Sequence, residues 1–450
     1  MNNNTNNKEN STTTSNNSDS KQKGFGLAIT TSMVIGTMIG SGIFLLPASL
    51  AEFGSISFVG WAITALGALC IAWVFAKLSG WQPGLGGPYY YTRLGVGEFP
   101  AFLVAWGYWV SIWVGNAAVS IAAASYLSLI IPEIKSYSWL TPVIALGFVW
   151  FFTWINIKGV REAGIVQLLL TLLKGIPLIL FGLVGLFFID FDLVSQTPEV
   201  EQSLGASVLA AMSLWLWAFL GVESASIPAD NINEPRKTIP RATLIGVVLV
   251  ACIYLFGSIV VFGSMSLSEL SNSAGPYADA AGKIWGGWAF YAMATVAIVS
   301  SIGALNGLIL LGGQMPRAAA NDGLFLKSFA ELNSDGAPAK GLIISAILTS
   351  LLVLTNLSES TLGLFTFSIL LSTTSVLIPY IFCASAAIRL QPKETAKPMT
   401  TIIFILGLIY SLWALGGSGE DAVYWGFILA MASVPVYIVI KMVNDPKTTD

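Results

Sequence analysis

Histidine is absent from the 450 residues of this chain, and charged residues make up only 10% of it. The absence of histidine excludes a histidine general base, a histidine-liganded metal site and an imidazole pH switch, so any proton transfer would use carboxylates, lysines or tyrosines. Average soluble domains contain about 25% charged residues. A chain with so little charge, 55% hydrophobic residues and a mean hydropathy of +0.76 is not a soluble globular protein.

Cysteine is also scarce. Cys70, Cys252 and Cys383 each lie alone in an apolar stretch, which is typical of a packed side chain and not of a disulfide or metal ligand. The sequence contains neither a nucleotide-binding P-loop nor a cluster of metal-ligating residues. We therefore expect no cofactor and no metal, and any transport would be driven by ion gradients or by exchange.

Long apolar runs are what the chain has in abundance. From Phe25 onward they alternate with short polar segments, and each is long enough to cross a bilayer as a helix. Because the runs are continuous and do not alternate in polarity, strands of a membrane β-barrel are excluded. We predict an all-α polytopic membrane protein with twelve transmembrane helices, centred on residues 25–50, 58–78, 100–130, 141–156, 163–188, 206–228, 242–263, 285–315, 341–356, 362–388, 400–415 and 421–442.

The distribution of Lys and Arg predicts the orientation. If the N-terminus is cytoplasmic, only Lys135 and Lys283 of the 21 Lys and Arg residues fall outside, and Lys174 falls within a span. We therefore expect a multi-pass protein of the bacterial inner membrane with both termini in the cytoplasm. Residues 1–23 are Asn, Ser, Thr and Lys with almost nothing apolar, which predicts a disordered tail. The expected organisation is this tail, a ten-helix core at 24–390, two further helices at 391–442 and a C-terminal tail at 443–450.

Two of the predicted spans contain glycine and proline where a stable helix would not. Gly40 precedes Pro47 by seven residues in the first span, and Gly221 precedes Pro228 by seven residues in the sixth. Close packing of helices through small residues would also explain the glycines. Interrupted helices at corresponding places in two halves are, however, typical of inverted-repeat transporters, whose site lies at the breaks. Free N–H and carbonyl groups there suit the two charged ends of an amino acid.

Five motifs occur in order along the chain: GSGIFLLPA at 40–48, GGPY at 86–89, WAFLGVESAS at 217–226, NEPRKTIPRA at 233–242 and AANDGLF at 319–325. Together they resemble the amino acid–polyamine–organocation superfamily, and within it the basic amino acid/polyamine antiporters, with the bacterial arginine/agmatine antiporter nearest. The resemblance covers residues 25–442. It implies the leucine-transporter-like fold, with two inverted repeats of five helices, breaks in helices 1 and 6, and two additional helices. It also implies a homodimer.

The resemblance also implies roles for residues at the two breaks. Ser41 and Gly42 would bind the substrate carboxylate through backbone N–H and hydroxyl groups. Leu220 would offer its carbonyl to the substrate α-ammonium group. Trp217 would stack over the substrate and act as a gate.

Five further residues receive roles in the same way. Asn116 and Ser372 would contact the polar end of the substrate side chain. Tyr108 and Tyr380 would close the outer and inner ends of the site as gates. Glu223 matches an acidic residue that the family links to proton sensing or to binding of cationic substrates.

Leu308 is a departure from the arginine/agmatine antiporter, which has a tryptophan at the corresponding position of span 8. Leucine offers no aromatic face to a guanidinium or ammonium group. The departure argues against specificity for arginine, while transport of some amino acid or amine remains the expectation.

Glu223 and Lys174 are the two charged residues that lie well inside predicted spans, where a charge costs about 2.5–3.5 kcal/mol on insertion scales. A structural carboxyl bonded to nearby backbone is the alternative for Glu223, and extension of the side chain to the membrane surface is the alternative for Lys174. Proton-coupled members of the superfamily place a span 5 lysine between the breaks of spans 1 and 8, and Lys174 looks similar. We expect both residues to be linked to protons.

Taken together, these features predict an amino acid transporter that works by alternating access, and not an enzyme. Antiport of an amino acid against its decarboxylated amine, or against another amino acid, is the first expectation. Proton-coupled uptake using Lys174 and a non-transporting nutrient sensor are the alternatives. The expected partners are the small-molecule substrate, the lipid bilayer and a second copy of the chain, with no nucleic acid.

Overall fold

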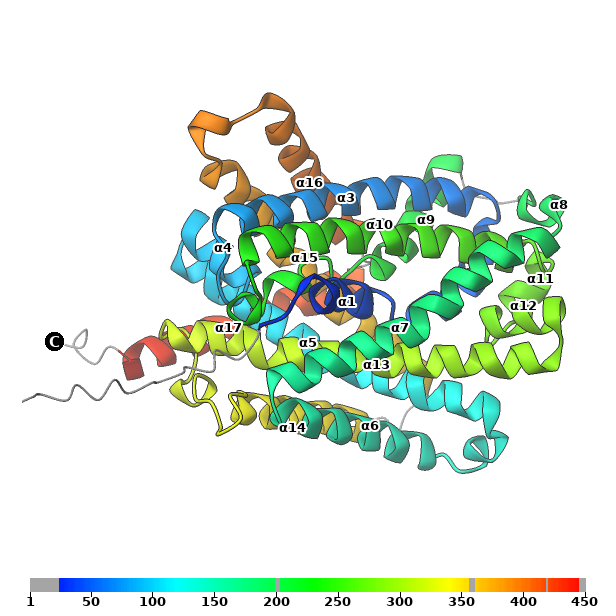
Figure 1. The fold of residues 1–450 in the computed structure, drawn as a ribbon, viewed down its shortest axis with the longest axis horizontal. Helices are drawn as coiled ribbons and strands as arrows, with labels where there is room; N and C mark the ends of the chain where they lie inside the picture. The colour runs from blue at the N-terminus through cyan, green and yellow to red at the C-terminus, as the bar shows by residue number, and fades with distance from the viewer. Residues whose placement is uncertain (1–23, 199–202, 356–360, 418–419, 445–450) are drawn as a thin grey trace, which may run out of the picture.

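The computed structural model describes residues 24–198, 203–355, 361–417 and 420–444, and these residues are largely helical (Figure 1). Within those ranges, the only β contact is an isolated bridge between Phe25 and Ile232. The α-helices are α1 (Leu27–Met38), α2 (Gly42–Leu50), α3 (Ile56–Trp81), α4 (Pro88–Gly95), α5 (Glu98–Ile130), α6 (Leu140–Ile157), α7 (Val160–Gly185), α8 (Phe191–Val194), α9 (Leu204–Ala218), α10 (Pro235–Phe262), α11 (Leu267–Ser271), α12 (Pro276–Trp285), α13 (Gly287–Asn321), α14 (Ala339–Thr355), α15 (Thr361–Leu390), α16 (Pro398–Gly417) and α17 (Glu420–Asn444).

The prediction of an all-helical membrane protein is confirmed. In the described part of the chain, nine helices are long and apolar enough to cross a membrane, and the bent pair α1–α2 would make a tenth. The two other predicted spans coincide with α9 and α14, which are apolar but have only 15 and 17 residues. The count of twelve spans and the inverted repeat therefore stay predictions. The predicted tail at 1–23 lies outside the described residues.

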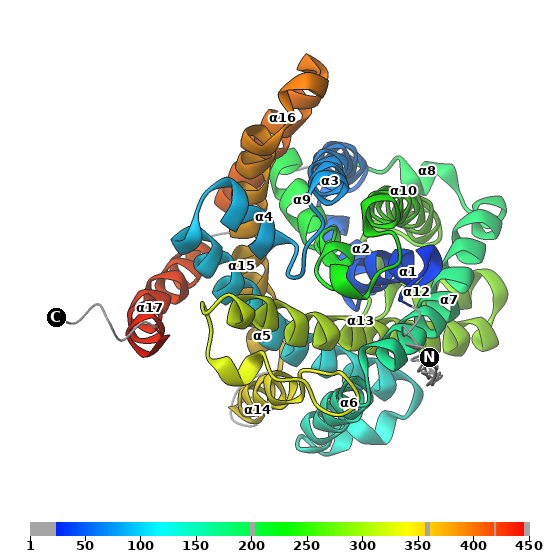
Figure 2. The same ribbon diagram turned by 60° about the vertical axis from the view of Figure 1, so that its left-hand side comes forward.

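Two long helices form the centre of the molecule. Helices α5 and α13 have 33 and 35 residues, pack against each other, and are mostly buried. Helices α16 and α17 lie at the periphery and are mostly exposed (Figure 2). Among the nine candidate spans of the described residues, the two predicted additional helices are therefore the least buried.

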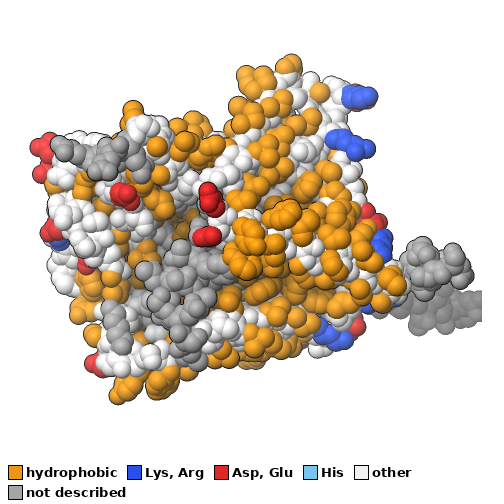
Figure 3. All heavy atoms as spheres, turned by 180° about the vertical axis from the view of Figure 1, so that it is seen from behind, with side chains coloured by type: hydrophobic (Ala, Val, Ile, Leu, Met, Phe, Trp, Pro, Cys, Tyr) orange, Lys and Arg blue, Asp and Glu red, His pale blue; other side chains and the backbone are white. Residues whose placement is uncertain are grey.

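The surface is that of a protein surrounded by lipid. Large apolar side chains on α7, such as Leu169, Leu172 and Leu173, are about half exposed. In Figure 3 hydrophobic side chains cover most of the middle of the molecule, while most of the Lys and Arg side chains on that face lie at its right-hand end. This separation of apolar belt and basic end matches the charge pattern of the sequence.

The interruptions predicted in the first and the sixth span are both present. The first span bends by 40° between α1 and α2. The sixth span is interrupted after Ala218, where its α-helix ends, and the chain beyond forms turns and short 3-10 segments. Gly221 has a φ of +103°, which side-chain-bearing residues rarely adopt, and Pro228 has no N–H for a helix.

The expected break in span 8 is absent, since α13 runs without interruption from Gly287 to Asn321. Its glycines serve close packing instead. A Cβ at Gly303 would lie 3.2 Å from Leu170 and 3.4 Å from the Lys174 ammonium, so glycine lets α13 approach α7 closely.

Candidate functional site

The two interrupted spans meet at a central cavity of about 90 Å³. The break between α1 and α2 and the turns after α9 form part of its wall, and α5, α13 and α15 form the rest. Helices α1 and α9 end at the cavity and α2 begins there, so the last carbonyls of α1 and α9 and the first N–H groups of α2 have no partner within a regular α-helix. The cavity therefore has both backbone donors and backbone acceptors on its wall.

The first break is fixed by two tyrosines that the sequence analysis did not single out. Tyr126 donates a hydrogen bond to the Ser41 carbonyl at 2.8 Å. The Tyr254 hydroxyl lies 2.8 Å from the Met38 carbonyl and 3.0 Å from the Ala218 carbonyl, so it joins the ends of α1 and α9. Ser41 itself is fully buried, lines the cavity, and its hydroxyl has no partner. An unpaired buried hydroxyl is costly unless a ligand uses it.

Gly42 and Trp217 are in direct contact across the two breaks. A Cβ at Gly42 would lie 1.3 Å from Cζ3 of the Trp217 ring, so only glycine leaves room for the indole. Both residues line the cavity. Glycine at position 42 is therefore also needed to make room for the Trp217 ring, which the sequence pattern did not predict.

Gly42→Ala should displace Trp217 and weaken substrate binding about 5- to 150-fold, because an overpacked methyl group costs about 1–3 kcal/mol. The measurement is a ligand-induced thermal shift across a panel of amino acids and amines. Gly40→Ala is the matched control, since its Cβ would lie at an ordinary 3.4 Å from Ala304. Equal binding by wild type and Gly42→Ala would show that the Trp217 position does not matter for the substrate.

Thr37 links the two breaks directly. Its hydroxyl lies 3.0 Å from the Ser224 hydroxyl and 3.4 Å from the Gly221 carbonyl, and it also reaches the Met33 carbonyl at 2.8 Å. A Cβ at Gly221 would lie 2.9 Å from the Thr37 hydroxyl. Thr37 and the Tyr254 hydroxyl described above therefore make the two breaks one connected unit.

Glu223 is the only charged side chain among the described residues that line the cavity. It is 1% exposed, and Tyr108 donates a hydrogen bond to its Oε1 at 2.6 Å. Tyr380 donates to its Oε2 and accepts a hydrogen bond from the Gly221 N–H at 3.2 Å. Both tyrosines thus contact one carboxylate. Tyr108 lines the cavity and Tyr380 lies behind Glu223 outside the described lining, and their roles as gates stay predictions.

The other predicted contact residues divide into two groups. Leu220, Leu308 and Ser372 line the cavity, and the Ser372 hydroxyl donates to the Ser111 carbonyl at 2.9 Å. Asn116 is buried but does not line the cavity. It lines a separate small gap with Thr153, and its carbonyl oxygen has no partner. Asn116 lies at the edge of the α5 face that points to the cavity. For a residue at such an edge, helical periodicity in the sequence does not decide whether its side chain reaches the cavity.

Lys174 lies outside the cavity wall and is completely buried. Its ammonium group donates to the carbonyls of Gly36 at 2.8 Å, Ile39, and Ser300 at 3.3 Å. The Ser300 hydroxyl also donates to the Gly40 carbonyl at 2.9 Å. The lysine therefore ties the end of α1 to α13, and the alternative that it extends to the membrane surface is wrong. In the described residues, no three potential metal-ligating side chains come together.

Comparison with known proteins identifies the family. A family model described as amino acid permease matches residues 25–441. The chain is 32% identical over 434 residues to the cadaverine/lysine antiporter of Escherichia coli, covering 93% of this chain and 95% of the relative. It is 29% identical over 430 residues to the putrescine transporter PotE of Escherichia coli (93% and 97% covered) and 30% identical over 441 residues to that of Haemophilus influenzae (95% and 99% covered). The chain therefore belongs to the amino acid permease family, within the superfamily that its motifs predict.

Proposed function

We propose that this protein is an antiporter that exchanges a cationic or neutral amino acid for an amine, or for another amino acid, by alternating access. One observation carries the proposal: the described lining of the cavity has one carboxylate, Glu223, and no basic side chain. A buried site with a single negative charge favours a ligand with a positive group. The similarity to a cadaverine/lysine antiporter and to putrescine transporters supports a ligand of this class.

The backbone supplies the complementary half of the proposed site. The first N–H groups of α2 at Gly42 and the unpaired Ser41 hydroxyl would bind a substrate carboxylate, because a helix N-terminus is partially positive. The carbonyl of Leu220 at the end of α9 would accept from the α-ammonium group. Trp217, packed on Gly42, would cover the substrate, and the hydroxyl of Ser372 would lie near its side chain.

Counterflow in liposomes tests the proposal. Purified protein is reconstituted with unlabelled lysine, cadaverine or putrescine inside, and uptake of the labelled compound is followed. Antiport requires uptake to depend on internal substrate. Uptake into empty liposomes at the same rate would contradict it.

The geometry of Lys174 favours proton-coupled uptake as the second candidate. A buried ammonium group that ties α1 to α13 could release that tie when it loses its proton. Uptake driven by an inward proton gradient without internal substrate would support this alternative. Binding without flux under either condition would instead support the nutrient sensor.

Leu308→Trp should raise the preference for arginine or agmatine over neutral amino acids. A desolvated cation–π contact contributes up to about 2 kcal/mol, which corresponds to about 30-fold in affinity. Leu308 lines the cavity, so an indole there would face the ligand. The measurement is competition binding of the two substrate classes.

Leu308→Met is the control for this substitution, because it changes the side chain without adding an aromatic ring. An unchanged preference in Leu308→Trp would remove this position from the determinants of specificity. Tight native binding of arginine above every neutral amino acid would also contradict the reading.

We further propose the membrane placement that the Lys and Arg distribution predicts, with both termini cytoplasmic in a bacterial inner membrane. The division into a core at 24–390 and two peripheral helices at 391–442 is supported by the exposure of α16 and α17. The homodimer stays a prediction, and cross-linking in native membranes tests it.

A further inference from the structure

An apolar groove of about 380 Å³ lies on the outside of the molecule between α7, α12 and the first half of α13. Every side chain that lines it is hydrophobic, among them Leu180 and Phe181 of α7, Trp285 of α12, and Trp288 and Ala292 of α13. Figure 1 shows that α7 and α13 cross and then separate toward the end that carries α11 and α12. The groove is distinct from the central cavity, because the two have no lining residue in common.

The groove faces the hydrocarbon of the bilayer and not water. Helices α7 and α13 are both candidate membrane spans. At the rims of the groove, Leu180 and Trp288 are 54% and 71% exposed, and neighbouring side chains of α7 are similarly exposed and apolar. Hydrocarbon chains are the solvent for such a surface. What fills a groove here is consequently lipid, unless another protein covers it.

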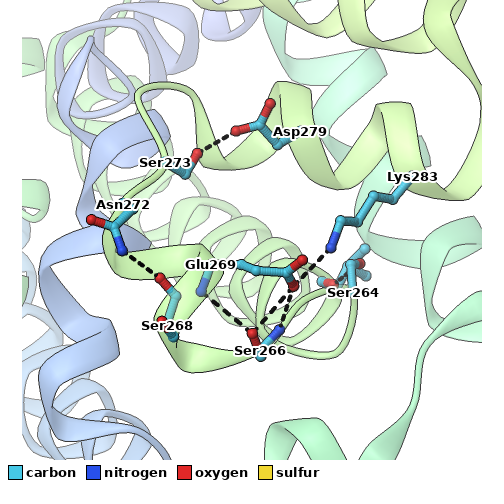
Figure 4. A network of polar contacts seen from close by, with 9 residues as sticks. Ser264, Ser266, Ser268, Glu269, Asn272, Ser273, Asp279 and Lys283 are labelled. Carbon is cyan, nitrogen blue, oxygen red and sulfur yellow. Dashed lines mark hydrogen bonds and ion pairs between the residues drawn. The ribbon is translucent and has the colours of Figure 1, made fainter.

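One end of the groove lies at the membrane boundary. Trp285 ends α12 and Trp288 lies in the first turn of α13, and tryptophans are enriched at the level of the lipid headgroups. On the opposite face of α12, Lys283 is paired with Glu269 at 2.8 Å and lines a separate hollow (Figure 4). The hydrogen bond from Lys283 lowers the pKa of the Glu269 carboxyl, which favours its charged form.

The α11–α12 segment that carries this end is held by its own polar contacts. Ser266 and Glu269 form a capping box at the start of α11, and Ser273 donates to Asp279 of α12 (Figure 4). An occupant of the groove would thus have one end at Trp285 and Trp288, at the level of the headgroups, and an apolar chain running along α7 and α13. We infer that this groove binds one acyl chain of a membrane phospholipid.

The walls of the groove are connected to the substrate cavity by a series of aromatic contacts. The ring centroids of Trp285 and Phe181 are 6.0 Å apart, and Phe181 lies 5.3 Å from Tyr277 of α12. Tyr277 in turn lies 5.3 Å from Phe44 of α2. Since α2 begins at the cavity with Gly42, an acyl chain that fixes Phe181 and Trp285 also restrains the helix whose N-terminus would bind the substrate carboxylate.

Filling the groove tests the inference. Ala292 is exposed within the groove, and Ala292→Trp would occupy its space. The probe is phosphatidylglycerol with a photoreactive diazirine in the acyl chain, incorporated in liposomes with the purified full-length protein. We expect labelled peptides from α7, α12 and α13 in wild type and at least a fivefold loss of that label in Ala292→Trp.

Ala62→Trp is the matched control, because Ala62 is exposed on α3, which does not line the groove. It should keep the wild-type label. Leu180→Trp fills the groove from the opposite wall and replaces Ala292→Trp if that variant does not fold. Label that is unchanged in the filled variants, or spread evenly over all lipid-facing helices, would overturn the inference. Cross-links between two copies through the groove would also overturn it.

The effect on transport rests on the proposed function, whereas the labelling does not. We expect counterflow by wild type to change at least twofold between liposomes with saturated and unsaturated acyl chains, and counterflow by Ala292→Trp to be independent of them. An acyl-chain dependence that persists in Ala292→Trp would overturn the connection to the cavity. Groove labelling in a protein without any counterflow would contradict the proposed function and leave the acyl-chain site supported.

Discussion

Glu223→Gln should lower the affinity for cationic substrates about 10- to 100-fold and leave the affinity for neutral amino acids within about threefold of wild type. Hydrogen bonds to a charged group contribute about 1.5–3 kcal/mol each, and the substitution removes the charge while it keeps the shape. A carboxylate has about four acceptor sites, and Tyr108 and Tyr380 occupy two of them. Because Glu223 lines the cavity, its carboxylate can meet a substrate ammonium group there. Equilibrium binding of lysine, cadaverine and a neutral amino acid to purified protein measures the difference.

Two tyrosine variants control for the position of the carboxylate. Tyr108→Phe and Tyr380→Phe each remove one hydroxyl from Glu223 and leave its charge in place. We expect each to change cationic binding less than Glu223→Gln does. If Glu223→Gln instead weakens cationic and neutral substrates equally, the carboxylate holds the tyrosines together and does not bind the substrate.

The membrane character of the fold could be read from sequence because it depends on local composition. An apolar run of about 20 residues has few options other than a membrane helix. The same reasoning located the first break, since Gly40 and Pro47 disfavour a continuous helix wherever the chain folds. It also located the interruption of the sixth span near Gly221, but it was wrong for span 8, where packing against neighbouring helices decides the outcome. In α13, Gly303 serves close packing against α7 and not a break.

The candidate site could be predicted only where it depends on the family motifs. Those motifs predicted site roles for Ser41, Trp217 and Glu223, and all three residues line one cavity. They did not predict that Gly42 makes room for the Trp217 ring, because that contact joins residues far apart in the sequence. Tyr254 was also missed. Its only signal was a hydroxyl in the middle of the apolar span 242–263, which in a membrane needs a hydrogen-bond partner.

The hydrogen bonds of Tyr254 and Thr37 have a mechanical consequence for alternating access. Tyr254 reaches both Met38 and Ala218, and Thr37 reaches both its own helix and Ser224. The end of α1 and the turns after α9 are therefore bonded to each other at two places. If these bonds persist through the cycle, the two breaks move together, and the contacts that must change lie between this unit and its neighbours. Lys174 makes such contacts.

Lys174→Met should slow exchange at least about tenfold while substrate binding changes less. The Lys174 ammonium group donates to Gly36 and Ile39 at the end of α1 and to Ser300 on α13. A cation is favoured there because the C-terminal end of a helix is partially negative. If these contacts form in only one conformation, losing one charged hydrogen bond of about 1.5–3 kcal/mol shifts the conformational equilibrium by about 10- to 150-fold. Counterflow and equilibrium binding, measured on the same preparation, separate the two effects.

The pH profile distinguishes a proton-linked lysine from a fixed tie. The chain has no histidine, so no side chain ordinarily titrates between about pH 5 and 8. A wild-type exchange rate that varies over this range, with a flat profile in Lys174→Met, would assign the proton to Lys174. Lys158→Met is the matched control, because Lys158 is exposed and its ammonium group contacts only the Trp154 ring at 3.9 Å among the interactions described for it. If Lys174→Met exchanges at the wild-type rate with the wild-type pH profile, neither the charge of Lys174 nor its hydrogen bonds are needed. The hydrogen bond from the Ser300 hydroxyl to the Gly40 carbonyl would then be sufficient to join α13 to the first break.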